Sequence, residues 1–258
     1  MPDLPPGTQK AHLLWRGPMT EPMVDVELAD IARRRSSTWW LLSRLVIDQP
    51  QEPWVGELET VLGTVDANPE TPLGSESAAL LTALRAARAQ ADGLTALAVD
   101  RTSLFAGVMH KKTLSAPYES VVLGQEMNSD LVLDVVQCYQ EAGLTDFCLE
   151  LGPPDFLGTE LRFMSILVYQ EMLAHQAVDA GLAAQWLAMQ RRFLESHLLN
   201  WVPEHCERLA AMAKTPFYKA LAQLLSAACQ LDQGDLVKVS ERIGQPMAAD
   251  VLVTESFR

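Results

Sequence analysis

Residues 159–180, TELRFMSILVYQEMLAHQAVDA, decide the fold class, because their apolar side chains cover more than one side of a helix. Thr159 is suited to an N-cap and Gly181 to a C-terminal stop, which predicts a helix from Glu160 to Ala180. A helix that is apolar nearly all round lies at the centre of its domain. The segment therefore predicts an α-helical protein built around one buried helix.

Apolar residues spaced at three, four and seven positions recur on both sides of this helix, whereas no clear run of period-two alternation indicates a strand. Proline and glycine residues separate the helical segments. We therefore predict an all-α fold of about ten helices in a single globular domain at 25–243, with a Pro-rich arm at 1–24 and a tail at 244–258. The other predicted helices cover 24–48, 54–62, 75–91, 94–105 and 128–141. Ser75 is the expected N-cap of the third of these, and Asn128 or Ser129 that of the fifth. An apolar stripe from Trp186 to Trp201 predicts a further helix, followed by one that starts at Pro203 and one from Pro216 to Gly234.

Composition limits the class of partner. The 258 residues are 48% hydrophobic and carry a formal charge of −13, from 33 acidic and 20 basic residues. This balance argues against general binding to nucleic acid, which needs clustered Lys and Arg, and it suits a cationic partner. We find no export signal and no apolar run long enough to span a bilayer, so we expect a cytoplasmic protein without membrane insertion.

Motifs for enzyme chemistry are missing from the sequence. The four cysteines form no C-x-x-C pair and are interpreted as reduced, mostly buried thiols. The histidines give no H-E-x-x-H, and no P-loop, dinucleotide fingerprint or nucleophile elbow occurs. We therefore expect no catalytic residues, no metal site, no cofactor and no enzymatic activity. The arginine runs 33–35 and 191–192 are interpreted as helix surface charge.

Four segments, in this order, resemble the TorD/DmsD/NarJ family of redox-enzyme maturation chaperones over roughly residues 25–231. The segment around Phe156 departs from the family's usual pattern, because the family has a histidine at that place. The segments are Arg35-x-x-x-Trp39-x-x-Leu42; Asp100-x-x-x-Leu104-Phe105 followed by Ala116-Pro117-Tyr118-Glu119-Ser120; Gly152-Pro153-Pro154-Asp155-Phe156-Leu157-Gly158-Thr159-Glu160-Leu161-Arg162-Phe163-Met164; and Phe193-Leu194-x-x-His197-Leu198-x-x-Trp201-x-Pro203 with Phe217-Tyr218.

The resemblance implies a cytosolic all-helical chaperone. Such chaperones bind the twin-arginine leader or N-terminal region of the precursor of a molybdopterin-containing oxidoreductase subunit, hold it until the cofactor is inserted, and then permit export. The resemblance implies no covalent chemistry and allows a homodimer. The alternative function is an oligomeric helical scaffold or regulator that binds another protein without leader specificity.

A leader with two arginines and an apolar stretch needs an apolar groove with acids at one end. The candidate groove residues are Trp39, Trp40, Leu104, Phe105, Tyr118 and Phe156, because aromatic side chains bury a large area with few rotors. The candidate arginine acceptors are Glu119, Asp155 and Glu160, and Ser120 is a further candidate for binding the leader.

Each of these residues also has a purely structural interpretation. Trp39 and Trp40 point in different directions on a helix, so at least one is expected in the core, and Leu104 and Phe105 fit the core as well. Asp155 can cap the helix that begins beside it, Glu160 suits the first turn of that helix, and Tyr118 and Ser120 can fix the loop conformation.

Overall fold

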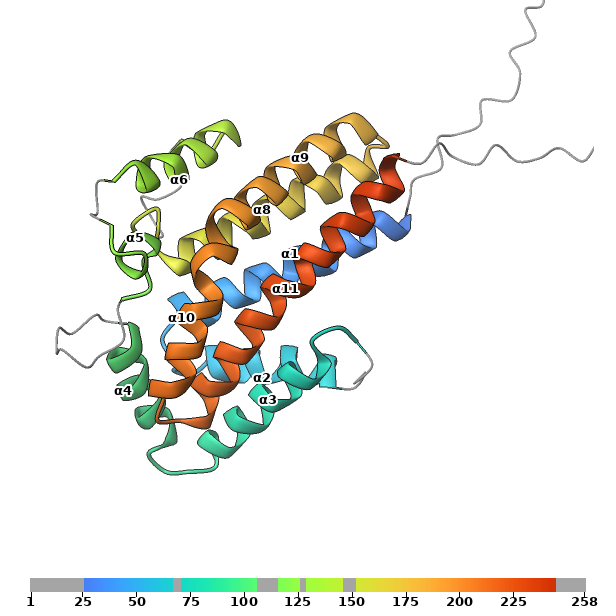
Figure 1. The fold of residues 1–258 in the computed structure, drawn as a ribbon. Helices are drawn as coiled ribbons and strands as arrows, with labels where there is room; N and C mark the ends of the chain where they lie inside the picture. Colours follow the sequence, from blue (N-terminus) through green and yellow to red (C-terminus); the bar gives the residue numbers. More distant parts are fainter. Residues whose placement is uncertain (1–25, 67–70, 106–115, 126–128, 146–151, 245–258) are drawn as a thin grey trace, which may run out of the picture.

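The computed structural model describes residues 26–66, 71–105, 116–125, 129–145 and 152–244. These residues form helices joined by turns, without a named strand among them (Figure 1). The prediction of an all-α, single-domain fold is confirmed. The predicted arm at 1–24 lies outside the described residues, as does the tail beyond Gly244, so these boundaries stay predictions.

Four long helices form the body of the fold. They are α1 (Val26–Ile47), α8 (Leu157–Gln176), α9 (Ala180–Phe193) and α11 (Pro216–Gly244), and Figure 1 shows them running alongside one another. α8 packs against α1 and α9, and α11 contacts the same two helices. The segment expected at the centre therefore does form a buried helix, with its apolar residues in contact on several sides.

The other helices complete the fold at one end and one side of this body. α2 (Trp54–Asp66), α3 (Gly74–Arg88), α4 (Gly93–Phe105) and α10 (Leu199–Met212) gather around the first half of α11, with α2 packed on α3. α5 (Glu119–Val122) and α6 (Asp130–Glu141) lie beside α8 and α9.

Several predicted helix ends are wrong because the capping does not come from the expected side chain. α8 begins at Leu157 with Phe156 in the N-cap position, so Thr159 lies inside the first turn. α3 follows Leu73, whose φ is +64°, and the Ser75 hydroxyl donates to Glu76 instead of capping. Between α8 and α9 the chain turns at Val178, and Asp179 caps α9 by accepting from the Leu182 N–H at 2.8 Å.

The expected break at Pro203 is also wrong. α9 continues into α10 through a π-helical turn, Leu194–Leu198, and Pro203 lies within α10. His197 and His205 therefore belong to one continuous helical run, in which the His197 ring lies tilted against Phe193 and the His205 ring meets Trp201 edge to face. At the other end, α11 runs through Gly234 to Gly244.

A buried arginine joins the four long helices. Arg35 of α1 donates to Asp232 of α11 at 2.6 and 3.1 Å, to Glu171 of α8 at 2.9 Å and to Gln190 of α9 at 2.7 Å. Gln190 in turn donates to Glu171 at 2.9 Å. Burial alone would lower the pKa of Arg35, but Asp232 and Glu171 raise it above its ordinary value, so the guanidinium stays charged. Arg35 is thus a core residue, whereas the sequence suggested surface charge.

We predict that Arg35→Met destabilises the protein by about 3–5 kcal/mol, because it leaves two buried carboxylates without their cation. The measurement is the free energy of unfolding from urea titrations. Arg33→Met is the matched control, since the Arg33 side chain is 61% exposed and pairs with the exposed Asp30, and it should change stability by less than about 1 kcal/mol. Equal losses for the two variants would contradict the assigned role of Arg35.

Candidate functional site

Two segments of the family resemblance, far apart in sequence, meet in a short backbone bridge. The Glu119 N–H donates to the Asp155 carbonyl at 2.9 Å and the Leu157 N–H to the Pro117 carbonyl at 2.9 Å. Tyr118 and Phe156 form the bridge pair, and their ring centroids lie 5.6 Å apart. The bridge places the start of α5 directly against the start of α8.

Asp155 holds the N-terminus of α5. Its Oδ2 accepts from the Ser120 N–H at 3.2 Å and from the Ser120 hydroxyl at 2.5 Å. These bonds satisfy a backbone donor that the helix start leaves without an intrahelical partner. The prediction that Asp155 caps a helix is therefore correct, but the capped helix is α5 and not α8, which begins beside Asp155.

Glu119 is buried against His197. Its Oε2 lies 3.0 Å from His197 Nδ1, and on the other side of the ring Nε2 lies 3.4 Å from Asp134 and 3.9 Å from the Cys138 sulfur. Burial works against the charged imidazole, but the interactions with Cys138 and Glu119 outweigh it and raise the pKa of His197 to about 9. The ring is therefore cationic at neutral pH.

Glu160 is the second fully buried carboxyl group of this region. Its Oε2 accepts from the Trp201 indole N–H at 3.2 Å. Burial, and after it the charge of Glu119, raises the pKa of Glu160 well above its usual range. The other carboxyl oxygen of Glu119 and that of Glu160 lack a protein donor among the described residues. A proton held by Glu160 therefore reduces the repulsion between two buried acids.

The three acids expected at the mouth of a groove are thus inside the protein. Glu119 and Glu160 have no exposed surface, and Asp155 is 4% exposed and satisfied by Ser120. A guanidinium arriving from solvent cannot reach them in this conformation. Trp39, Leu104 and Phe105 are buried in the core as well. For these residues, and for the buried Ser120, the geometry favours the structural interpretation.

Three of the expected groove residues remain accessible. Trp40 is 40% exposed, and Tyr118 and Phe156 are half-buried. Gly158 lies between Phe156 and the end of α1, since a Cβ added there would come within 2.7 Å of Phe156 and 2.5 Å of Ile47. We call the three accessible aromatic residues Trp40, Tyr118 and Phe156, together with the aliphatic Ile47, the aromatic patch.

Charged side chains border the aromatic patch. The guanidinium groups of Arg44 and Arg162 lie over the Trp40 ring, 5.0 and 5.6 Å from its centroid. Arg44 also pairs with Asp48 at 2.5 Å and with Glu57 at 3.6 Å. The surface therefore offers aromatic area beside both cations and solvent-facing carboxylates.

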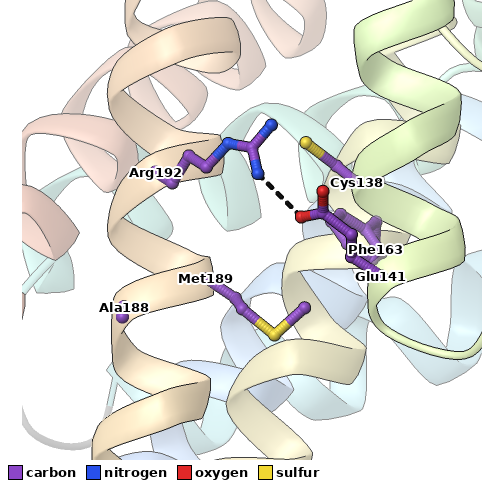
Figure 2. Close-up of a pocket in the computed structure, with 6 residues that line it drawn as sticks. All are labelled: Cys138, Glu141, Phe163, Ala188, Met189 and Arg192. Atoms are coloured by element: carbon purple, nitrogen blue, oxygen red, sulfur yellow. Dashed lines mark hydrogen bonds and ion pairs between the residues drawn. The ribbon is translucent and has the colours of Figure 1, made fainter.

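A cavity of about 180 Å³ opens between α6 and α9, with Phe163 of α8 among its lining residues. Figure 2 shows Arg192 reaching from α9 toward Cys138 and Glu141 on α6. Arg192 pairs with Glu141 at 2.7 Å and with Asp134 at 3.2 Å. The remaining lining residues are Ala188 and Met189, so the interior is largely apolar. Sequence reasoning missed this cavity because its residues come from three helices.

Sequence reasoning also missed the role of two motif residues. Asp100 accepts from the Lys214 and Thr215 N–H groups and from the Thr215 hydroxyl, which fixes the turn before α11. His197 was part of the fourth segment, but its partner Glu119 is 78 residues away. The only signal in the sequence was that Glu119 and His197 both lie in segments that resemble the same family.

Comparison with known proteins identifies the family. The model of the nitrate reductase delta subunit family matches residues 67–207. The chain belongs to this family. The resemblance to TorD/NarJ chaperones is confirmed.

Individual relatives agree with the family assignment. The chain is 28% identical over 211 residues to "Chaperone protein TorD" of Photobacterium profundum, a match covering 80% of this chain and 94% of that protein. It is 27% identical over 214 residues to the Vibrio cholerae protein of the same name, with 80% and 94% covered. A "Perchlorate reductase assembly chaperone protein" of Dechloromonas aromatica is 33% identical over 110 residues, covering 43% of this chain and 48% of that one.

These relatives are named as chaperones, a role that involves no catalysis, in agreement with the expectation of a non-enzymatic protein. Within the described ranges, no helix has the length and apolarity needed to cross a bilayer.

We predict that Asp155→Ala lowers the free energy of unfolding by about 1–2 kcal/mol, because the α5 cap is lost. Ser120→Ala, which removes only the hydroxyl, should lose less. Thermal or urea denaturation of both variants is the measurement. A fully stable Asp155→Ala protein would contradict the capping role.

We predict that the two histidines of the α9–α10 run have opposite effects on the pH dependence of stability. The pKa of His197 is raised from 6.5 to about 9, so its contribution is complete below pH 6.5 and is lost as pH rises to 9. Burial, and then Arg208, lower the pKa of His205 to about 4, so stability falls as pH drops from 6.5 to 4. Each effect reaches at most about 3 kcal/mol.

The measurement is the unfolding free energy of wild type, His197→Gln and His205→Leu between pH 4 and pH 9.5. Relative to wild type, the His197 variant should flatten the curve above pH 6.5 and the His205 variant below it. Parallel curves for all three proteins would contradict both assignments.

Proposed function

We propose that this protein is a maturation chaperone for a molybdopterin-containing oxidoreductase. The observation that carries the proposal is the family match together with relatives of similar length, which the chain covers almost completely. The names of these relatives describe chaperones, one of them for assembly of a reductase.

We further propose that the protein binds the twin-arginine leader or N-terminal region of its client precursor, in the cytoplasm, before cofactor insertion and export. The aromatic patch supports this proposal, since an exposed tryptophan beside half-buried rings can anchor an apolar helix. The buried acids Glu119, Asp155 and Glu160 do not take part in contacting the leader. The bordering carboxylates Asp48 and Glu57 are accessible enough to accept its arginines.

Leader capture is predicted to depend on the aromatic patch. Trp40→Ala and Phe156→Ala should each weaken binding about tenfold, as expected for an interface aromatic. The measurement is titration of a carrier protein bearing a twin-arginine leader from the same genome. Val99→Ala, an exposed apolar position on α4, is the control and should bind like wild type.

Three outcomes distinguish the alternative functions. Binding that weakens with salt and on Asp48→Asn indicates that the arginines are recognised by surface acids. If every leader from the genome fails to bind while the folded precursor binds, the scaffold alternative without leader specificity is favoured. If the precursor fails to bind as well, the chaperone proposal is wrong for that client.

A further inference from the structure

Cys138 has surroundings that the chaperone function does not explain. Its sulfur lines the α6–α9 cavity and lies 3.9 Å from His197 Nε2. His197 Nδ1 in turn lies 3.0 Å from Glu119. A thiol, an imidazole and a carboxylate thus stand in a row, drawn from α6, the π-helical turn and α5. This is the arrangement in which a histidine oriented by an acid activates a nucleophile.

Basic side chains stand on two sides of the Cys138 sulfur. The cationic His197 ring stands on one side, and Arg192 approaches from α9 across the cavity (Figure 2). The opposing charges are Asp134 and Glu141 on α6 itself, and both are paired with Arg192. Neighbouring cations are the usual cause of thiol reactivity in proteins.

The other described cysteines provide an internal comparison. Cys206 and Cys229 are buried in the α10–α11 region, and neither lines the cavity. Burial raises the pKa of Cys206 to about 12 and that of Cys229 well above its ordinary value. Both are expected to stay unreactive in the folded protein, whereas Cys138 lines the cavity and lies beside His197.

We propose that Cys138 is a modification site that undergoes thiol–disulfide exchange with small disulfides carrying a carboxylate. The apolar part of the ligand lies on Phe163, Ala188 and Met189, and its carboxylate competes with Glu141 for Arg192. The ion pair is about half exposed, so a small ligand can displace it from the mouth of the cavity.

The exchange balances without a further reactant. The Cys138 thiolate attacks one sulfur of the disulfide, a new S–S bond forms to Cys138, and the original S–S bond breaks. Cys138 is oxidised, and the departing half leaves as a reduced thiolate. The thiol proton is released to the solvent when the thiolate forms, and the neighbouring His197 stays protonated.

The test uses the full-length folded protein and 5,5′-dithiobis(2-nitrobenzoate), an aromatic disulfide with two carboxylates. The rate of thiolate release is followed at pH 6 to 9, and the modified residue is identified by peptide mass mapping. Cys138 is expected to react at least about tenfold faster than Cys206 and Cys229. Because the chain also contains Cys148, peptide mapping is needed to assign the fast reaction to Cys138.

Three variants show separately what Cys138, His197 and Arg192 contribute to the reaction rate. Cys138→Ser should abolish the fast phase. His197→Gln should slow it about tenfold near pH 7, and a thermal melt checks that this protein is folded. Arg192→Met should slow the dicarboxylate probe more than the neutral 2,2′-dithiodipyridine. The proposal is overturned if folded wild type leaves Cys138 unmodified, or if Cys138 reacts with an unchanged pH profile in the folded His197 variant.

Discussion

The charge of Arg35 determines how the four long helices are arranged. One guanidinium takes its partners from α8, α9 and α11 while its own backbone belongs to α1. Hydrophobic contacts alone would tolerate small rotations of these helices against one another, since apolar packing is not directional. The planar donor fork of arginine is directional, so it fixes the rotation and the relative height of all four helices. The positions of α5 and α6 beside α8 and α9 depend on that arrangement.

The residues by which the family is recognised mostly stabilise the fold. Arg35, Asp100, Asp155 and Trp201 each satisfy buried polar groups that lie far away in sequence. A sequence motif made of such residues identifies the fold reliably but does not mark the surface that meets a partner. In this protein two of the accessible aromatic rings, Tyr118 and Phe156, belong to the motifs themselves, and Trp40 directly follows the buried motif residue Trp39.

The fold class could be predicted because the helical apolar spacing is a local property, and the buried α8 followed from its composition. Helix ends were less predictable, since Ser75 and Thr159 have the right chemistry for caps but bond elsewhere or lie inside the helix. The sequence predicted which segments belong to the candidate site, but not which of their side chains lie close together. The proximity of Tyr118 to Phe156 and of Glu119 to His197 depends on long-range packing that no spacing rule contains. For the same reason the sequence could not show whether an acid faces solvent or the interior.

The π-helical turn at Leu194–Leu198 determines which side of the helix each later residue of the fourth segment faces. A π-helical turn adds one residue to a regular helix, which rotates everything after it by about 100°. With the extra residue, Phe193 and His197 face α6 and α5, while Trp201 and His205 still face inward further along. Deleting a single residue here would leave a longer and more regular helix whose second half presents its polar side to the interior. The irregularity is therefore what allows one continuous helix to serve two differently oriented parts of the molecule.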